Sequence, residues 1–214
     1  NKEKIKNYSL VFFDFDGVIK ESNAVKTDAF KKLFLKYGDD VVKKVIKHHE
    51  LHEGVSRYEK IPYYFSEFIG ININDLELDR LSKKFSRLVV DKVIACAWVR
   101  GAKEFLEKNQ YNQEFILVTG TPHNEIIQIL NRLEISHHFA EIYGSPSKKS
   151  TVIGTKLLKD ENLRRKAIFI GDSNTDYEAA KENNISFIYR ITNITNFKIS
   201  KNSLFCIKDF KELL

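Results

Sequence analysis

The sequence predicts an α/β protein with a doubly wound parallel sheet that is interrupted by an inserted block of four helices. Three observations predict this fold class. Tyr8–Phe13 is a short apolar run, which is typical of a strand buried on both faces of a parallel sheet. Residues 20–95 show helical periodicity without a strand signal. After Trp98, strand-like runs alternate with helical segments, and this alternation indicates right-handed crossovers between parallel strands.

The helical block contains four segments in which apolar residues recur with the spacing of one helix face. Gly38 ends the first segment, since glycine readily takes the backbone conformation that closes a helix. The apolar positions are, in order, Phe30, Leu33, Phe34 and Tyr37; Val41, Val42, Val45, Ile46 and His49; Ile61, Tyr64, Phe65 and Phe68; and Leu78, Leu81, Phe85 and Leu88. We therefore expect residues 21–96 to form a helical insertion and residues 1–20 and 97–214 to form the α/β core.

The segments that follow the insertion are expected to complete the α/β core. The expected strands are Phe115–Val118, Ile142–Gly144, Ala167–Ile170, Ile185–Tyr189 and an edge strand at Leu204–Ile207. The expected helices are Ala102–Lys108, a segment containing Ile126 and Leu133, Val152–Leu158, and a segment that begins at Ala179 and stops near Asn184. Thr192–Asn202 is polar, so we expect a surface loop there.

The composition sets broad limits on the kind of protein. A chain of 214 residues with 43% hydrophobic residues can form one large domain, or one domain with an insertion. Because we find neither a membrane helix nor a signal peptide pattern, we expect a cytoplasmic protein without membrane contact. Cys96 and Cys206 lie in apolar runs and are expected to be buried thiols in a reducing compartment. The formal charge is +6, but the basic residues form no evident stripe, so we expect no nucleic-acid binding. We also expect a monomer or a weak dimer.

Polar side chains stand at the carboxyl ends of several predicted strands. They are Asp14 and Asp16 after the first strand, Thr119 after the second, Lys148 and Lys149 after the third, and Asp172 and Asp176 after the fourth. In a doubly wound sheet these ends meet at one crevice, where ligands bind. Asp14, Asp172 and Asp176 offer the hard oxygen ligands that Mg²⁺ prefers, and a lysine can neutralise phosphoryl charge. A carboxylate nucleophile, a metal ion and a cation together indicate a phosphoryl-transfer site.

The same residues lie in motifs that resemble those of a known superfamily. The motifs are Asp14-Phe15-Asp16-Gly17-Val18, Leu117-Val118-Thr119-Gly120-Thr121, the lysine near 149, and Gly171-Asp172-Ser173-Asn174-Thr175-Asp176. In order and spacing they resemble the four motifs of the haloacid dehalogenase superfamily over essentially the whole chain. The insertion at residues 21–96 resembles the helical cap of the phosphoglycolate phosphatase and β-phosphoglucomutase branch. The resemblance implies a Rossmann-like catalytic core with an inserted cap domain.

The resemblance implies a role for each matching acid. Asp14 would be the nucleophile that forms an aspartyl-phosphate. Asp16 would protonate the leaving oxygen and then activate water, and its backbone carbonyl would touch Mg²⁺. Asp172 would bind Mg²⁺ with Asp176 beside it, so the expected metal residues are these four.

The resemblance also implies the residues that hold the phosphoryl group. Thr119 and Gly120 would bind it directly. Members of the family often carry the lysine three residues after the proline of a Gly-Ser-Pro sequence. Counting from Pro146 gives Lys149, and Lys148 is the alternative.

One loop of the insertion resembles a substrate-specificity loop. Gly54-Val55-Ser56-Arg57 matches the loop of the β-phosphoglucomutase branch, in which Arg57 would contact an anionic part of the substrate. In the alternative interpretation, Ser56 caps the next helix and Arg57 pairs with Glu53 or Glu59.

The sequence therefore predicts a Mg²⁺-dependent phosphatase that hydrolyses a small phosphorylated metabolite, such as a sugar phosphate or a phosphoglycolate-like compound. Asp16, Asp172 and Asp176 argue against dehalogenation, which needs neither a metal nor a general acid. Two alternatives remain. A phosphomutase would return the phosphoryl group to a sugar, and a non-catalytic binding protein could use the same fold.

Overall fold

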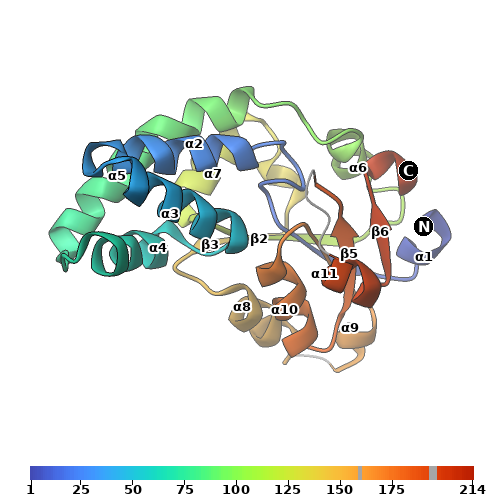
Figure 1. The fold of residues 1–214 in the computed structure, drawn as a ribbon. Coiled ribbons are helices and arrows are strands. Elements are labelled where there is room, and N and C mark those ends of the chain that lie inside the picture. The colour runs from blue at the N-terminus through green and yellow to red at the C-terminus, as the bar shows by residue number, and fades with distance from the viewer. Residues whose placement is uncertain (159–160, 193–196) are drawn as a thin grey trace.

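The computed structural model describes residues 1–158, 161–192 and 197–214. Within these ranges, six parallel strands form one sheet in the order β3-β2-β1-β4-β5-β6, which confirms the predicted fold class (Figure 1). The strands are β1 Leu10–Phe13, β2 Glu114–Pro122, β3 Glu141–Ser145, β4 Ala167–Gly171, β5 Ser186–Arg190 and β6 Phe205–Ile207. The chain order reverses at β1, so the carboxyl ends of β2, β1 and β4 meet at the centre of the sheet.

Helices cover both faces of this sheet. They are α1 Lys2–Ile5, α2 Asn23–Phe34, α3 Asp39–Leu51, α4 Arg57–Tyr64, α5 Asp75–Ala95, α6 Ala102–Lys108, α7 His123–Arg132, α8 Lys149–Leu157, α9 Glu161–Arg165, α10 Asn174–Glu182 and α11 Phe197–Asn202. Val11 and Phe13 of β1 pack with α6 and α7, whereas Leu10 and Phe12 pack with α8 and α10. All four residues are buried, because alternate side chains of a central strand face opposite helical layers.

The helical insertion places α2, α3, α4 and α5 at one end of the sheet, and the two termini lie at the other (Figure 1). Aromatic side chains fill its centre: Phe30 packs against Tyr64 and Phe85 at ring-centroid distances of 5.6 and 4.6 Å. Ser56 begins α4 by accepting a hydrogen bond from the Tyr58 amide at 3.2 Å, as the alternative interpretation of this loop expects.

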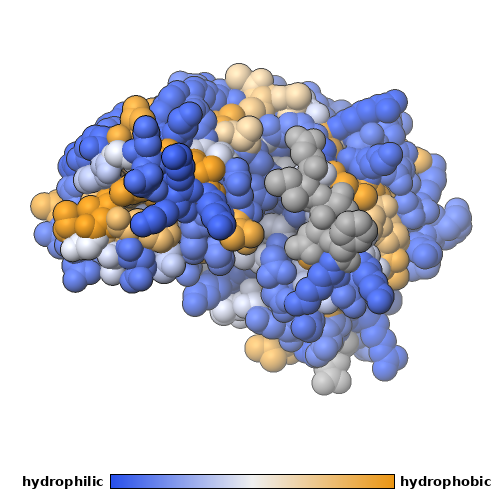
Figure 2. Space-filling view, viewed as in Figure 1, coloured by the Kyte–Doolittle hydropathy of each residue, from blue (hydrophilic) through white to orange (hydrophobic). Residues whose placement is uncertain are grey.

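The visible surface is mostly hydrophilic, with hydrophobic residues scattered mainly over the helical insertion (Figure 2). This surface agrees with a chain in which 30% of the residues are charged. Among the described residues, no helix combines the length and apolar character needed to cross a membrane.

Several expected boundaries are wrong. The second strand continues through Pro122, because Pro122 still pairs with Ser145 of β3 after a shift in register. Helix α10 begins at Asn174, five residues before the predicted start, because a capping box rather than an apolar pattern defines its first turn. Its polar first turn lacks the apolar periodicity on which the sequence prediction relied.

The carboxyl-terminal part also differs from expectation. The predicted loop Thr192–Asn202 contains α11, whose Ile199 is buried against the sheet layer. Residues 193–196 of that prediction lie outside the described residues. Cys96 and Cys206 are free thiols, but both are only half-buried, so the expectation of buried thiols is wrong.

Candidate active site

The central strands bring the predicted acids together. Phe13, the last residue of β1, lies opposite Leu117 of β2 and Ile170 of β4. Because the three strands run parallel, the residues that follow these positions reach the same edge of the sheet. Asp14, Thr119 and Asp172 are all buried there, although Thr119 lies within β2 rather than after it.

Asp14 is held by a lysine and by its neighbouring amide. Its Oδ2 accepts a hydrogen bond from Lys149 Nζ at 2.7 Å, and its Oδ1 accepts one from the Phe15 amide at 2.7 Å. Burial raises the pKa of Asp14 to about 7, although the charge of Lys149 opposes this shift. Lys149 makes this contact as the first residue of α8, whereas Lys148 precedes the helix with an exposed side chain.

Asp176 links this lysine to the loop after β4. Its Oδ1 accepts from Lys149 Nζ at 2.5 Å, and its Oδ2 accepts from the amides of Asp172 and Ser173 at 3.2 and 3.0 Å. Burial disfavours the charge of Lys149, but the carboxylates of Asp14 and Asp176 outweigh it and raise the lysine pKa. Asp176 therefore fixes Lys149 and the first turn of α10 at once.

Three carboxylates at this edge fit a metal ion. Within the described ranges, Asp14, Asp172 and Asp176 each offer an oxygen atom, and these atoms lie within 4.8 Å of one another. Burial, followed by the charges of Asp176 and Asp14, raises the pKa of Asp172 well above its usual value. Asp172 also accepts a hydrogen bond from Asn23 Nδ2 at 2.7 Å. Clustered hard oxygen donors that repel one another are the set that a divalent cation such as Mg²⁺ would stabilise.

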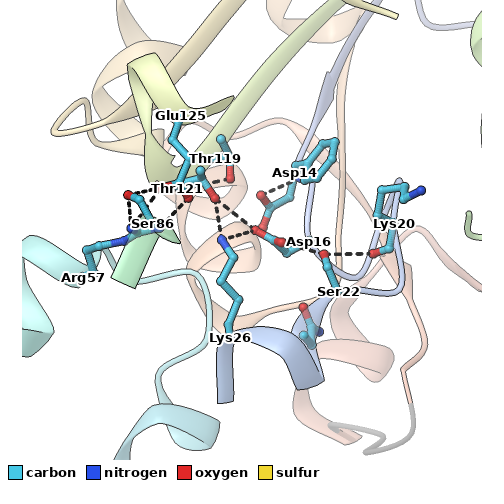
Figure 3. Close-up of polar contacts among 12 residues, drawn as sticks. Asp14, Asp16, Lys20, Ser22, Lys26, Arg57, Ser86, Thr119, Thr121 and Glu125 are labelled. Carbon is cyan, nitrogen blue, oxygen red and sulfur yellow. Dashed lines mark hydrogen bonds and ion pairs between the residues drawn. The ribbon is translucent and has the colours of Figure 1, made fainter. Parts of the chain in front are cut away.

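Asp16 occupies a different electrostatic environment. Its Oδ1 accepts from Ser22 Oγ at 2.6 Å, and its Oδ2 accepts from Lys26 Nζ at 2.9 Å and Thr121 Oγ1 at 3.1 Å (Figure 3). Burial opposes its charge, but Lys26 and the two hydroxyl donors outweigh burial and lower the pKa of Asp16. The pKa values of these two neighbouring acids are therefore shifted in opposite directions, upward for Asp14 and downward for Asp16.

Lys26 is a site residue that the sequence analysis missed. Its ammonium lies between Asp16 and Thr121 Oγ1, which it reaches at 2.9 and 2.6 Å (Figure 3). One signal was present, since Lys26 stands four residues before Phe30 and therefore shares the inner face of α2.

The loop at the start of α4 closes onto the α/β core. Gly120 lies against the backbone carbonyl of Gly54, and a Cβ at residue 120 would overlap that oxygen. Gly54 has φ of +81°, and a Cβ there would overlap Thr175 Oγ1, which donates to the carbonyl of Glu53 at 3.2 Å. Within β2, Thr119 Oγ1 accepts a hydrogen bond from the Thr121 amide at 3.2 Å. Glycine at 54 and 120 thus permits backbone contact between insertion and core.

Arg57 does not pair with the acids that the capping interpretation expected. Its guanidinium binds Glu125 of α7 in a bidentate pair at 3.0 and 2.5 Å (Figure 3). The guanidinium also lies 4.3 Å from the centroid of the Phe85 ring. Ser86 Oγ lies 3.0 Å from the guanidinium and also donates to Glu125. The expected pairing of Arg57 with Glu53 or Glu59 is wrong. Glu125 carried no sequence signal, because its partner lies 68 residues away.

These groups surround a cavity of about 60 Å³ between the sheet edge and the insertion. Its lining includes Asp14, Asp16 and Thr119 from the core and Lys26, His49 and Lys60 from the insertion. That volume holds only a few water molecules, whereas sites for small ligands usually enclose several hundred Å³. This cavity is therefore smaller than the usual site for a small ligand.

Comparisons with known proteins agree with this geometry. The family model described as haloacid dehalogenase-like hydrolase matches residues 11–189. A protein from Thermotoga maritima named "Phosphorylated carbohydrates phosphatase" is 26% identical over 199 residues, which cover 87% of this chain and 86% of that protein.

Solved structures share the fold. A β-phosphoglucomutase from Clostridium difficile has a TM-score of 0.75 and 22% identity, with coverage of 97% of this chain and 93% of that chain. A predicted phosphoglycolate phosphatase from Haemophilus somnus has a TM-score of 0.71 and 16% identity, with coverage of 97% and 96%.

Proposed function

The chain belongs to the haloacid dehalogenase-like hydrolases, and on this premise we propose that it is a Mg²⁺-dependent phosphatase that hydrolyses a small phosphomonoester through an aspartyl-phosphate. The observation that carries this proposal is the buried group of Asp14, Lys149 and Asp176, with Asp172 beside it. It combines a carboxylate nucleophile, a fixed cation and a set of oxygen ligands at one sheet edge.

In the proposed reaction two carboxylates carry the chemistry. Asp14 attacks the phosphorus, the bond to the leaving oxygen breaks, and Asp16 supplies the proton which that oxygen needs. Water then attacks the phosphorus of the aspartyl-phosphate while Asp16 takes its proton, and free phosphate and Asp14 are released. Ser22, Lys26 and Thr121 orient Asp16 through the hydrogen bonds that they donate, and these bonds favour its ionised form, which is the form that takes the proton from water.

Other residues stabilise the transferring group. Lys149, Thr119 and the Gly120 backbone would neutralise or bind the phosphoryl oxygens. Mg²⁺, when bound by Asp14, Asp172, Asp176 and the Asp16 carbonyl, would supply charge stabilisation for those oxygens. The helical insertion would act as a cap that excludes water from the first step after the substrate has entered.

The substrate class in this proposal is a phosphorylated carbohydrate or a related small metabolite. The name of the Thermotoga maritima relative supports this choice. A cytoplasmic location and a monomer or weak dimer remain predictions from the sequence.

A screen for release of inorganic phosphate tests the proposal. Purified protein with Mg²⁺ should hydrolyse p-nitrophenyl phosphate and at least one phosphorylated carbohydrate, while Asp14→Asn should hydrolyse neither. Sugar-phosphate isomerisation that depends on a bisphosphate primer, without net phosphate release, would identify a phosphomutase instead. Absence of both reactions would support a non-catalytic protein.

A further inference from the structure

The insertion buries a cation that the proposed reaction does not use. Lys60 of α4 is 2% exposed and lines the same cavity as Asp14 and Thr119. Its Nζ lies 2.9 Å from His49 Nδ1 and 5.7 Å from the centroid of the Phe30 ring. Lys60 therefore belongs to the part of the cavity wall that the insertion supplies.

The other cations of the cavity have carboxylate partners. Lys26 forms an ion pair with Asp16, and Arg57 forms one with Glu125. Lys60 forms no ion pair with any acid in the part of the chain that the structure describes. Glu53 favours the charged form of Lys60 only through space. Among the described residues, the one hydrogen-bond partner of the Lys60 ammonium is neutral His49. Two of the three donors of this ammonium are thus left for another group.

Burial of a cation without a counterion is unfavourable. Desolvation lowers the pKa of Lys60 to about 7, and Lys26 adds to that effect, while Glu53 opposes it. The pKa of His49 is lowered to about 2, mainly by burial and then by Lys60, so His49 remains a neutral acceptor for the lysine. An anion placed beside Lys60 would remove this penalty, because it would supply the missing opposite charge.

We propose that Lys60, held in place by His49, is the residue of the insertion that selects the substrate, by binding a second anionic group that the substrate carries besides its transferred phosphate. This inference rests on the proposed phosphatase function. It assigns to Lys60 the anion-binding role that the loop resemblance implied for Arg57. In this structure the guanidinium of Arg57 forms an ion pair with Glu125. The second group is a carboxylate or another phosphate, since either can accept two hydrogen bonds from one ammonium.

Matched substrate pairs test the proposal on the full-length protein with Mg²⁺. Each pair differs in one anionic group: phosphoglycolate with 2-hydroxyethyl phosphate and 6-phosphogluconate with sorbitol 6-phosphate test a carboxylate, and glucose 1,6-bisphosphate with glucose 6-phosphate tests a phosphate. The native protein should prefer the charged member of at least one pair by about 10-fold or more in kcat/KM. Equal rates within every pair would overturn the proposal without reference to any variant.

Lys60→Gln should remove most of that preference, a change of about 10-fold or more, mostly through kcat/KM for the charged member, and Lys60→Arg should restore part of it. Lys44→Gln is the matched control, because it removes the same charge from an exposed position on the insertion. Equal losses for both members of a pair would overturn the proposal, since they would mean that Lys60 acts on the transferred phosphate or only on the fold. If the proposed phosphatase function is itself wrong, neither the native protein nor any variant will hydrolyse p-nitrophenyl phosphate, and this result differs from every outcome that concerns Lys60.

Discussion

Removal of either partner from the buried pair of Arg57 and Glu125, which joins the helical insertion to the α/β core, should strongly destabilise the protein. The side chains are 4% and 5% exposed, and their two hydrogen bonds connect α4 to α7. Removing one partner of such a pair leaves the other charge buried without compensation, which typically costs about 3–5 kcal/mol. Glu125→Gln keeps the shape of the side chain but removes its charge, so we expect a loss of about 3 kcal/mol in the free energy of unfolding.

Urea unfolding at neutral pH measures this loss, and a double-mutant cycle separates the pair from the rest of the site. Arg57→Met and Glu125→Gln should each be destabilising, and the double variant should lose clearly less than the sum of the two. A chain of this size should show a decrease in Tm of roughly 6–12 °C for each single variant. Lys83→Met is a control for loss of a cation in an exposed ion pair, and it should cost less than about 1 kcal/mol.

Kinetics then show whether Arg57 also serves the substrate. If its role is to hold the insertion, Arg57→Met should affect kcat/KM for p-nitrophenyl phosphate and for a carbohydrate phosphate to similar extents. A loss of roughly 30- to 1000-fold confined to the larger substrate would instead support the substrate contact implied by the loop resemblance. A coupling energy below about 0.5 kcal/mol would refute the structural argument, because a buried bidentate pair must be coupled.

Three further predictions concern the site. Asp14→Asn should abolish turnover while the protein stays folded, and more than a few percent of native activity in this variant would exclude Asp14 as the nucleophile. Asp16→Asn should lower kcat by about 10²–10⁴-fold. EDTA should abolish phosphate release, Mg²⁺ should restore it and Ca²⁺ should inhibit; full activity in a metal-free preparation would contradict the assignment of Asp172 as a ligand. His49 is neutral in the folded state, where its pKa is lowered to about 2, but takes up a proton below about pH 6.5 when unfolded. Its contribution to stability is therefore complete above pH 6.5 and is lost as the pH falls towards 2, by about 2 kcal/mol at pH 5. Urea unfolding at pH 7.5 and 5 should show a smaller pH dependence for His49→Gln, and an unchanged dependence would argue against this burial effect.

The sequence by itself determined the sheet and the residues at its carboxyl edge. Short apolar runs identify buried strands, and in a parallel sheet the polar residues after adjacent strands must meet. This local information was sufficient to predict that Asp14, Thr119, Asp172 and one of the two lysines Lys148 and Lys149 lie together, and the family resemblance favoured Lys149. It also predicted the insertion, because helical periodicity over residues 20–95 is a local property of the chain.

Local patterns failed where a short segment depends on its neighbours. The first turn of α10 is polar and is defined by the reciprocal hydrogen bonds of Ser173 and Asp176, so apolar spacing could not locate its start. Helix α11 similarly lacked a clear pattern, and its Ile199 is buried only because the sheet layer lies beneath it.

Only the tertiary structure decided which charges meet across the cavity. Lys26 with Asp16 and Arg57 with Glu125 join segments that are far apart in the sequence or separated by a turn. Lys60 lies beside His49 because α3 and α4 turn these faces toward each other. Helical spacing predicts which side chains share a face, but the direction in which that face points is set by the packing of whole helices against one another and against the sheet.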